Sequence, residues 1–526
     1  MYIGGNMKEK RLSKKLGIAA LIVNICVVLA TVFVEIVLYN IVSYKDYIVL
    51  EYLPIKYIIF AEIILVVLVI IPFVIKWGKK SAIASIVMSA VLTVALVVVG
   101  ILGVVYNGEI KDKISTTEKT LDKIVENSQL ATDEYGVYVL KDDGAEKLSD
   151  VADYNVGYCL KYASDDTTTV VNSIESELGK VIKKQKIDDP SHLADALLNR
   201  QVKAIILNQS LIDTIKSAGD DDNNGKLDGT YAKFDSKIKC IYSITVKNAL
   251  AAMSDPGNVT KRCFNVYISG IDTEGDVTVK SRSDVNIIMS VNPLTHRILL
   301  ISTPRDCYVP LSISNGVKDK LTHAGIYGID VSMKTLEMLY DINFDYYVRM
   351  NFTGFVDIID ALGGVDVQSD YDFSTHGYSY HQGLNENLSG IEALWFARER
   401  HAFADGDHQR GRDQMKVIEA VIKKCQSTAL LNNYDKILSN VSKSFQTNMN
   451  KDSIKSLVKF QLNTAPSWKV TTYSITGRGA SEFTYSVPSK RAYVMYPDES
   501  TINAAKKMLS QNKNNKKVKE VTEKVE

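Results

Sequence analysis

The stretch 264–306 decides the fold of the larger part of this chain, and it reads FNVYISGIDTEGDVTVKSRSDVNIIMSVNPLTHRILLISTPRD. Three segments within it are predicted to be strands: Phe264–Ser269, Val285–Val291 and Ile298–Ser302. The first alternates between apolar and polar residues, whereas the second and third are almost continuously apolar. Such apolar runs are typical of strands that are covered on both faces. The stretch therefore predicts a domain of the α/β class.

Charged residues stand at each of the three strand boundaries. The first strand runs into Asp272, Arg282 and Asp284 precede the second, and the third ends in Arg305 and Asp306. Ligand sites of α/β folds commonly lie at strand ends. We therefore expect these side chains to share one site.

A second cluster of charges lies further along the chain. Leu388–Phe396 is predicted to be a helix capped by Ser389, and it leads into Arg398 and Arg400. Two positions that differ by two residues diverge by about 200° on a helix. The two arginines can therefore act together only if this helix ends near Arg398. The next helix is predicted from about Met415 to Ser427.

The arginines of both clusters predict a site for an anion. Several arginines suit phosphate or pyrophosphate, because each guanidinium offers planar, bidentate hydrogen bonds. Asp272 and Asp284 suit a hard divalent ion such as Mg2+, which binds a few carboxylates together with phosphate oxygens. The alternative is a set of surface ion pairs, because Glu399, Asp306 and Asp413 are adjacent partners. The arginines expected to converge are Arg282, Arg305, Arg398, Arg400 and Arg410.

Three long apolar runs occupy the N-terminal part of the chain, roughly Leu16–Val42, Tyr57–Ile75 and Ser81–Tyr106. Each reaches the ~20 residues that a helix needs to cross ~30 Å of hydrocarbon. Basic residues precede the first run, and others lie between the second and third at Lys76–Lys80. The positive-inside rule then places the N-terminus and the second loop in the cytoplasm. We predict a cell-membrane protein with three spans and an extracellular C-terminal portion.

The composition limits the class of protein further. The chain has 526 residues with a formal net charge of +1, which argues against a nucleic-acid binder with a basic surface. The cysteines suggest no disulfide framework, although one bridge such as Cys240 to Cys263 stays open. The tail Gln511–Glu526 is rich in Lys, Asn and Glu and is predicted to be disordered.

Between the apolar runs and the strands lies a stretch whose residues indicate no particular chemistry. Glu109–Asn127 is predicted to be a charged helical stalk. Strand-like and helical pieces then alternate, including a helix over Thr168–Gln185, which predicts a small α/β domain with some parallel pairing. Asp220–Gly225 resembles the opening of a calcium loop, but Tyr231 stands where such a loop needs Glu. A solvated turn is the preferred interpretation of that stretch, and a metal site is the alternative.

Several short motifs occur in an order that resembles the LytR-CpsA-Psr family. The resemblance covers the chain densely from about Phe264 to Lys424 and extends to about Ser510. The motifs are Arg282-Ser283-Asp284, Thr303-Pro304-Arg305-Asp306, Lys320-Leu321-Thr322-His323-Ala324, Asn351–Phe355 through Gly363–Val365, and Ala397-Arg398-Glu399-Arg400 through Gln414.

The resemblance implies a membrane-anchored enzyme of the Gram-positive envelope. Such enzymes transfer an anionic glycopolymer, with its phosphate, from undecaprenyl pyrophosphate to peptidoglycan, usually to the C6 hydroxyl of muramic acid. It also implies an α/β/α sandwich around an apolar cavity for the polyprenyl chain. The implied organisation is a cytoplasmic tail with three spans over 1–106, a stalk and accessory domain over 107–259, a catalytic domain over 260–510 and a charged tail over 511–526.

The resemblance also assigns roles to individual positions. Asp272 and Asp284 resemble the Mg2+ ligands of the family. Arg305, Asp306 and Asp407 are the expected catalytic residues. By their position in the sequence, Asp306 and Asp407 are the candidates for the base, and orienting an arginine is the alternative role for Asp306. His323 is a weaker candidate for the base, since a structural histidine is as good an interpretation. The residues expected to hold the pyrophosphate are Arg282, Arg305, Lys320, Arg398, Arg400, Arg410 and Gln414.

The chain departs from the family pattern at two positions, and two other functions stay open. Many members have tyrosine where this chain has Gly325, and many have arginine where it has Asp413, although Arg412 is a possible substitute. One alternative function is a polyprenyl-pyrophosphate hydrolase that uses water as acceptor. The other is a non-enzymatic envelope sensor or regulator that binds the lipid carrier.

Overall fold

A computed structural model of the chain describes residues 3–44, 55–74, 79–127, 130–218, 231–249, 255–271, 276–426 and 445–518. The predictions for Asp272 and for the acidic stretch 220–225 lie outside these residues. The chain divides into two compact units. One contains Met1–Lys119 with Ile454–Ala465, and the other contains Thr120–Ser453 with Pro466–Glu526.

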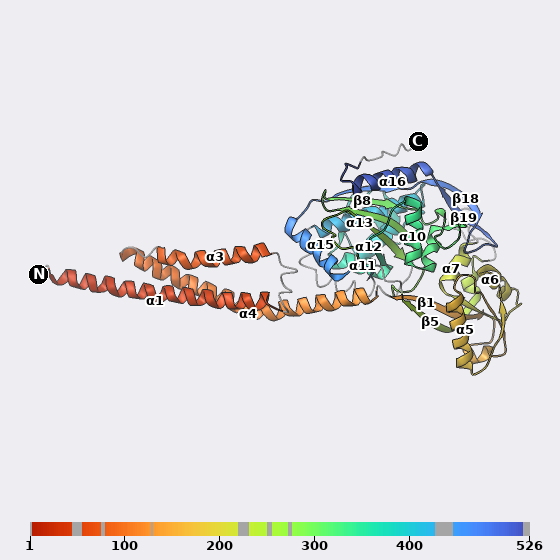
Figure 1. Ribbon diagram of the computed structural model, residues 1–526, viewed down its shortest axis with the longest axis horizontal. Helices are drawn as coiled ribbons and strands as arrows, with labels where there is room; N and C mark the ends of the chain where they lie inside the picture. The colour runs from red at the N-terminus through yellow and green to blue at the C-terminus, as the bar shows by residue number, and fades with distance from the viewer. Residues whose placement is uncertain are drawn as a thin grey trace. The chain divides into compact units, whose positions relative to one another are not determined.

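Three long apolar helices begin the chain (Figure 1). They are α1 (Ile3–Val42), α3 (Ile55–Val74) and α4 (Lys79–Asn127). Segments of all three, Lys14–Val42, Ile55–Val74 and Ala82–Glu126, are long and apolar enough to cross a membrane. The prediction of three such helices is confirmed. The third run and the charged stretch after it form the single helix α4.

These helices pack through small and polar side chains as well as apolar ones. The Ser89 hydroxyl on α4 donates to the Asn24 side chain on α1 at 2.6 Å. Polar contacts of this kind hold helices together where no water competes for them. The apolar part of the contact consists of Val27, Ala30, Val34, Leu65 and Leu96.

The second unit begins with a small mixed sheet, in the order β3-β2-β4-β1-β5. β2 pairs in parallel with β3 and β4, whereas β1 is antiparallel to β4 and β5. Val170 and Ile174 of α5 pack on one face, and Leu193 of α6 packs on the other. A small α/β domain with some parallel pairing is therefore confirmed, and we call it the accessory domain. Its elements are β1 (Leu130–Leu140), η1 (Leu148–Val151), β2 (Asn155–Tyr158), α5 (Ser164–Leu178), β3 (Lys183–Lys186), α6 (Pro190–Leu198), β4 (Ala204–Asn208), α7 (Ser210–Ser217), α8 (Phe234–Lys237) and β5 (Ile238–Ala249).

One predicted helix of this domain is shorter than expected. The helix predicted over 168–185 ends at Leu178, and Lys183–Lys186 forms the edge strand β3. Gly179 adopts the left-handed conformation, with φ of 64°, and its amide bonds to the last helical carbonyls. A glycine at this position ends a helix at little conformational cost.

The larger domain is built on a six-stranded mixed sheet in the order β16-β11-β6-β7-β8-β17. β7 is antiparallel to both neighbours, whereas β11 pairs in parallel with β6 and β17 with β8. The three strands predicted from the sequence are β6, β7 and β8. The six strands are β6 (Phe264–Ile271), β7 (Ser283–Asn292), β8 (Arg297–Ser302), β11 (Tyr346–Met350), β16 (Phe445–Gln446) and β17 (Lys469–Ser474).

Short strand pairs and helices surround this sheet. The strand pairs are β9 (Tyr308–Pro310) with β10 (Lys318–Lys320), β12 (Val365–Ser369) with β15 (Gly383–Leu388), β13 (Phe373–Thr375) with β14 (Tyr378–Tyr380), and β18 (Gly477–Phe483) with β19 (Arg491–Pro497). The helices are η2 (Leu321–His323), α9 (Ala324–Tyr327), α10 (Ile329–Tyr340), α11 (Phe352–Ala361), α12 (Gly390–Arg398), α13 (Asp407–Cys425) and α16 (Glu499–Lys513). The helix α15 (Lys451–Thr464) belongs mostly to the first unit.

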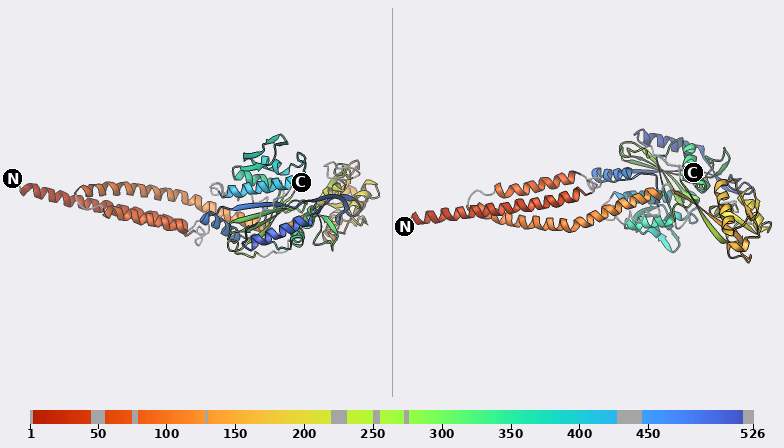
Figure 2. Two further views of the ribbon diagram at one scale, coloured as in Figure 1. Left: turned by 90° about the horizontal axis from the view of Figure 1, so that it is seen from above. Right: turned by 60° about the horizontal axis from the view of Figure 1, so that its bottom comes forward.

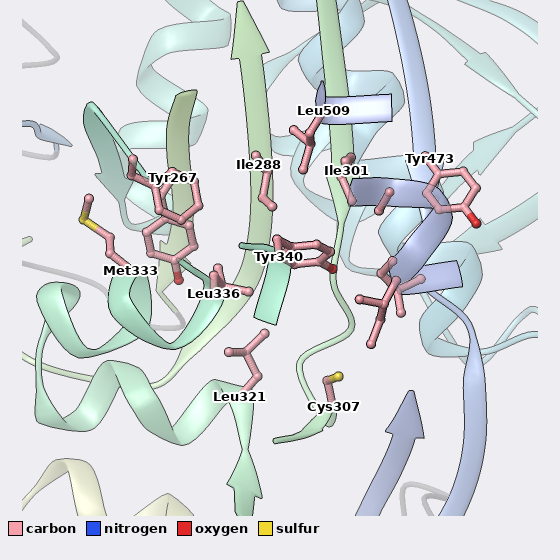
Figure 3. Packing of buried hydrophobic residues seen from close by; sticks show 14 of the residues in the cluster. Tyr267, Ile288, Ile301, Cys307, Leu321, Met333, Leu336, Tyr340, Tyr473 and Leu509 are labelled. Carbon is pink, nitrogen blue, oxygen red and sulfur yellow. The ribbon is translucent and has the colours of Figure 1, made fainter. Parts of the chain in front are cut away.

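One face of the six-stranded sheet is a close-packed core. Tyr267, Ile288 and Ile301 point from β6, β7 and β8 toward Leu336 of α10 and Leu509 of α16 (Figure 3). All five side chains are buried. Burying an aliphatic side chain contributes about 1.5–3 kcal/mol, so this face supplies much of the stability of the domain.

The other face is covered by α11, α12 and α13. Figure 2 shows these helices on one side of the sheet and α16 on the other. The domain is therefore a mixed α/β domain with helices on both faces, as the nearly continuous apolar sequences of β7 and β8 predicted. The helix predicted from about Met415 begins earlier, at Asp407, so the charged segment before it forms its first two turns. Cys240 and Cys263 are free.

Candidate active site

The charged residues predicted at strand boundaries meet at one edge of the six-stranded sheet. β6, β8 and β11 end at this edge, and β7 begins there because it runs antiparallel to β6 and β8. Asp284 lies at the start of β7, and Arg305 follows the end of β8. Chain direction alone therefore brings the two together.

Arg305 and Asp284 form a largely buried ion pair. Nη1 of Arg305 donates to Oδ2 of Asp284 at 2.5 Å, and the Thr322 hydroxyl donates to Oδ1 at 3.0 Å. Burial acts to raise the pKa of Asp284, but the positive charges of Arg305, Arg282 and Arg410 outweigh it and lower the pKa to about 2. Asp284 is thus an anion at neutral pH.

Asp306 forms a second buried pair with Lys320. The distance from Lys320 Nζ to Asp306 Oδ1 is 2.9 Å, and both side chains are buried. Burial raises the pKa of Asp306, but the charges of Lys320 and Arg305 outweigh it and hold the pKa below the usual range of a carboxyl group. A carboxylate with a lowered pKa is a poor proton acceptor.

The helix α12 ends at Arg398, which is the condition for Arg398 and Arg400 to act together. A capping box between Ser389 and Glu392 starts the helix, and its last residue is Arg398. The Arg398 guanidinium lies 4.1 Å from the centroid of the Phe352 ring and 5.1 Å from that of Trp395. These rings fix the planar cation by cation–π attraction.

A tight turn follows α12 and presents Arg400. The Glu399 Oε1 atom accepts hydrogen bonds from the backbone amides of Arg400 at 2.9 Å, His401 at 2.5 Å and Ala402 at 2.9 Å. These three bonds fix the backbone at the end of the helix. Glu399 therefore organises the turn, and it is not the surface ion-pair partner that the sequence offered as an alternative.

The first turns of α13 add Arg410 to the arginines gathered at this edge of the sheet. Arg410 forms an ion pair with Asp407, one turn earlier on the same helix. Burial and the positive charges of Arg410 and Arg305 lower the pKa of Arg400, although Asp407 partly opposes them. Like charges gathered in this way favour the binding of an anion. The Gln414 side chain donates to the Ala397 carbonyl at 3.4 Å, which joins α13 to α12.

A cavity of about 600 Å3 lies between the sheet and α11 to α13. Its walls are mostly apolar, with Met289, Phe355 and Ile418 among the lining residues. Leu299 and Ile301 of β8 belong to the packed core on the opposite face, and no residue of β8 lines this cavity. The predicted site residues that line the cavity are Asp284, Arg305, Arg398, Arg400, Arg410 and Gln414.

A smaller cavity of about 350 Å3 adjoins the first. It is lined by Asp306 and Asp407 together with Tyr493, and it shares Arg400 and His401 with the larger cavity. The basic cluster therefore stands between an apolar space and a polar one.

Two predicted site residues lie slightly apart from this cluster. Arg282 is close enough to lower the pKa of Asp284, but its Nη2 atom also lies 3.5 Å from Oδ2 of Asp213 on α7 of the accessory domain. Lys320 is buried behind Asp306 and lines neither cavity. The structure also shows two contributors that the sequence did not single out, Thr322 and Trp395. Thr322 stands inside one of the sequence motifs, but its bond to Asp284 depends on tertiary packing.

The two departures from the family pattern have different surroundings. A Cβ atom at Gly325 would lie 2.6 Å from the Ser281 carbonyl oxygen, so this backbone has no room for a larger residue. Asp413 is buried away from the apolar cavity, where its Oδ1 accepts from Gln409 at 2.9 Å. Burial is the main reason that its pKa is raised to about 6. Arg412 is held by Gln409 and Asp405 and does not line the apolar cavity.

His323 has a structural environment. Its Nδ1 atom lies 2.7 Å from Oδ1 of Asp319, and both side chains are fully buried. The other oxygen of Asp319 accepts from the Ser486 amide and hydroxyl at 2.9 and 2.5 Å. This network ties η2 to the segment before β19, and His323 lines none of the described cavities at the site.

The architecture and the site define a class of protein: apolar helices joined to an α/β domain, with a basic cluster at the mouth of an apolar cavity. A model of the LytR_cpsA_psr family matches residues 230–517, more than half of the chain. The chain therefore belongs to the LytR_cpsA_psr family.

Over the aligned residues, curated relatives are about a third identical to this chain. The chain is 35% identical over 215 residues to the polyisoprenyl-teichoic acid–peptidoglycan teichoic acid transferase TagU of Bacillus mycoides (strain KBAB4), covering 41% of this chain and 67% of that protein. It is 36% identical over 199 residues to TagU of Enterococcus faecalis (strain ATCC 700802 / V583), covering 38% of this chain and 65% of that protein. The chain thus spans about two thirds of the length of these relatives. The crystal structure of B. subtilis TagV is 29% identical, covers 48% of this chain and 98% of that one, and has a TM-score of 0.41.

Proposed function

We propose that this protein transfers an anionic glycopolymer, with its phosphate, from a polyprenyl pyrophosphate carrier to peptidoglycan. One observation carries the proposal: an apolar cavity opens onto a cluster of arginines that can hold pyrophosphate. A lipid tail and a charged head need those two environments side by side. The names of the curated relatives, teichoic acid transferases, support teichoic acid as the polymer.

The apolar cavity suits part of a polyprenyl chain. Each CH2 group that leaves water contributes about 0.8 kcal/mol, so a long tail must lie in protein or in the bilayer. Val285 and Met289 from the sheet and Phe352 and Ile359 from α11 offer such a surface. The pyrophosphate at the end of that tail would then reach Arg305.

In the proposed reaction the acceptor hydroxyl attacks the phosphorus that carries the glycopolymer. A new oxygen–phosphorus bond forms, the bridging bond of the pyrophosphate breaks, and polyprenyl phosphate leaves with the electron pair. Arg305, Arg400 and Arg410 would neutralise the oxygens as charge shifts toward the leaving group. The two predicted bases, Asp306 and Asp407, both line the smaller cavity. We favour Asp407, because Lys320 holds the pKa of Asp306 low.

The proposed Mg2+ site rests on Asp284 and Asp272. Asp284 fits a metal ligand, because it is ionised and lines the cavity, whereas Asp272 lies outside the described residues. Among the described residues no three His, Cys, Asp or Glu side chains gather into a metal site. When bound, the ion would offset phosphate charge and polarise the bridging oxygen.

The proposed topology places the larger domain outside the cell. Basic residues flank the first apolar helix on its N-terminal side and lie between the second and third. A reporter fused after Glu109 should therefore be extracellular, and one inserted at Gly78 should be cytoplasmic. Protease resistance of the C-terminal domain in intact protoplasts would contradict this orientation.

A transfer assay separates the proposed function from its alternatives. The purified full chain is incubated with lipid-linked glycopolymer, with and without peptidoglycan oligomers. Product that requires the oligomers supports transfer, release of glycopolymer phosphate without them indicates a hydrolase, and binding without turnover indicates a sensor. Arg410→Gln should abolish product, whereas Arg412→Gln on the same helix should retain it. Equal loss in both variants would contradict the assigned site.

A further inference from the structure

A third cavity lies between the accessory domain and the larger domain. Its volume is about 400 Å3, and its walls come from β1, β4, the start of α5, and the region of α9 and α10. It shares no lining residue with either cavity of the candidate active site. The volume falls within the usual range of small-ligand pockets, roughly 300–1,000 Å3.

Bonds between the two domains fix the walls of this cavity. The Thr132 amide donates to the Thr278 carbonyl at 2.9 Å, and the Lys280 amide donates to the Thr132 carbonyl at 2.8 Å. Lys280 Nζ also lies 2.6 Å from Oδ2 of Asp133. The Tyr162 hydroxyl donates to the Tyr485 carbonyl on the other side of the boundary. These bonds hold the walls of the cavity in place, so the cavity is a defined pocket between the two domains.

The polar lining offers both donors and acceptors. Asp133 is buried and already accepts from Asn208 and Lys280, so it forms a fixed, charged floor. Asp166 is only partly buried, and its pKa is raised by burial and by the neighbouring Asp133. No side chain caps the start of α5 after Ala163, so first-turn amides are available as donors beside the Asp166 carboxylate.

The opposite wall is apolar and aromatic. Tyr162 and Tyr327 line the pocket with their ring centroids 5.8 Å apart, and Leu211 and Ile326 continue the surface. Ile313 lies in the same wall with 41% of its surface exposed, so it stands at the rim. A ligand that fits here has an apolar face on one side and hydrogen-bonding groups on the other.

The charge of the lining selects against anions. Asp133, Asp165 and Asp166 face the pocket, and Lys280 is the basic residue that lines it. Phosphate groups of an anionic polymer would be repelled. Hydroxyl groups, in contrast, both donate and accept, and the C–H face of a sugar ring can pack on the aromatic wall.

We propose that this pocket binds a neutral, hydroxyl-rich sugar unit of a glycan. The identity of that glycan as the acceptor strand rests on the proposed function, whereas sugar binding itself does not. The accessory domain would then hold the neutral strand while the basic cluster holds the anionic donor.

The test measures binding of chitotetraose, a neutral N-acetylglucosamine oligomer, to the purified full chain by calorimetry. Asp166→Ala should weaken binding about two- to tenfold, because a hydrogen bond that needs no charge contributes about 0.5–1.5 kcal/mol. Asp166→Asn should restore most of the affinity, since a neutral ligand needs the acceptor oxygen and not the charge. Equal losses in both variants would indicate a cationic ligand and overturn the proposal.

A steric pair of variants provides the control. Ile313→Trp should weaken binding by filling the rim, whereas Val317→Trp, at an exposed position outside the lining, should not. No binding by the full chain at the solubility limit of chitotetraose would refute the sugar site, as would preferential binding of a glycerol-phosphate oligomer. If chitotetraose binds but the transfer assay fails, the sugar site is supported and the proposed function is refuted. Transfer without chitotetraose binding would refute the sugar site and support the proposed function.

Discussion

Replacing Asp284 by asparagine tests the electrostatic account of the site. The substitution keeps the shape of the side chain but removes the charge that faces Arg305 at 2.5 Å. The amide also places an NH2 donor where one carboxylate oxygen accepts, so it opposes the donor of either Arg305 or Thr322. We expect the larger domain to lose stability at neutral pH.

The expected loss of stability in Asp284→Asn follows from the pKa of the Asp284 carboxyl group. A shift from the ordinary 3.8 to about 2 corresponds to about 2.5 kcal/mol of favourable interaction. Breaking a buried pair by removing one partner costs about 3–5 kcal/mol, which agrees in order of magnitude. For a domain of this size, a loss of about 3 kcal/mol lowers the Tm by about 6–12 °C.

Thermal unfolding of the full chain in detergent at pH 7, followed by intrinsic fluorescence, measures the effect. Glu386→Gln on β15 is the control, since this side chain is exposed, and its Tm should match that of the wild type. Because the folded-state pKa is lowered, the wild type should lose this contribution as the pH falls from about 4 toward about 2. A Tm of Asp284→Asn equal to or above that of the wild type would refute the reasoning.

Three further predictions concern neighbouring residues. Arg305→Lys should weaken binding of a polyprenyl pyrophosphate about ten- to a hundredfold, because an ammonium lacks bidentate geometry and such bonds contribute about 1.5–3 kcal/mol; unchanged affinity by calorimetry would contradict this. Asp213→Ala should tighten the same binding by up to about fivefold, because it removes one half-exposed ion-pair partner of Arg282 that contributes at most about 1 kcal/mol; a weaker complex would show that Asp213 positions the arginine instead. The raised pKa of Asp413, about 6, means that the wild type should lose about 3 kcal/mol of stability as the pH rises from about 4 to above 6. In urea unfolding, Asp413→Asn should abolish this pH dependence of the free energy of unfolding. The same pH dependence in the variant and the wild type would contradict the prediction.

The features that the sequence predicted well are those that depend on local pattern. The apolar runs give three long helices, and Val285–Val291 gives a central strand because both of its faces need cover. The start of α12 also follows from local chemistry, since Ser389, the predicted cap, forms a capping box with Glu392. Positions at strand ends could be assigned to one site because strand direction brings them to one edge.

The features that the sequence did not predict depend on contacts between distant segments. Arg282 reaches Asp213, which belongs to another domain, and nothing in the spacing of the two residues signals that contact. Glu399 looked like an ion-pair partner, but the turn after α12 directs its carboxylate to backbone amides. Similarly, the early start of α13 at Asp407 reflects packing of its first turns at the site, which outweighs the weak helix propensity of that charged segment.

The pairing of charges at the site has a consequence for the proposed reaction. Asp284 is bound to Arg305, Asp306 to Lys320, and Asp407 to Arg410, so three cations of the site already face carboxylates in the free protein. A pyrophosphate that binds Arg305 or Arg410 would therefore compete with a carboxylate for the same guanidinium group. In the proposed reaction, a displaced Asp284 would become available to a metal ion, and a displaced Asp407 would face the smaller cavity without its ion-pair partner. The proposed function would thus couple donor binding to the release of Asp284 and Asp407 through the same guanidinium groups, whereas Asp306 would keep its buried lysine.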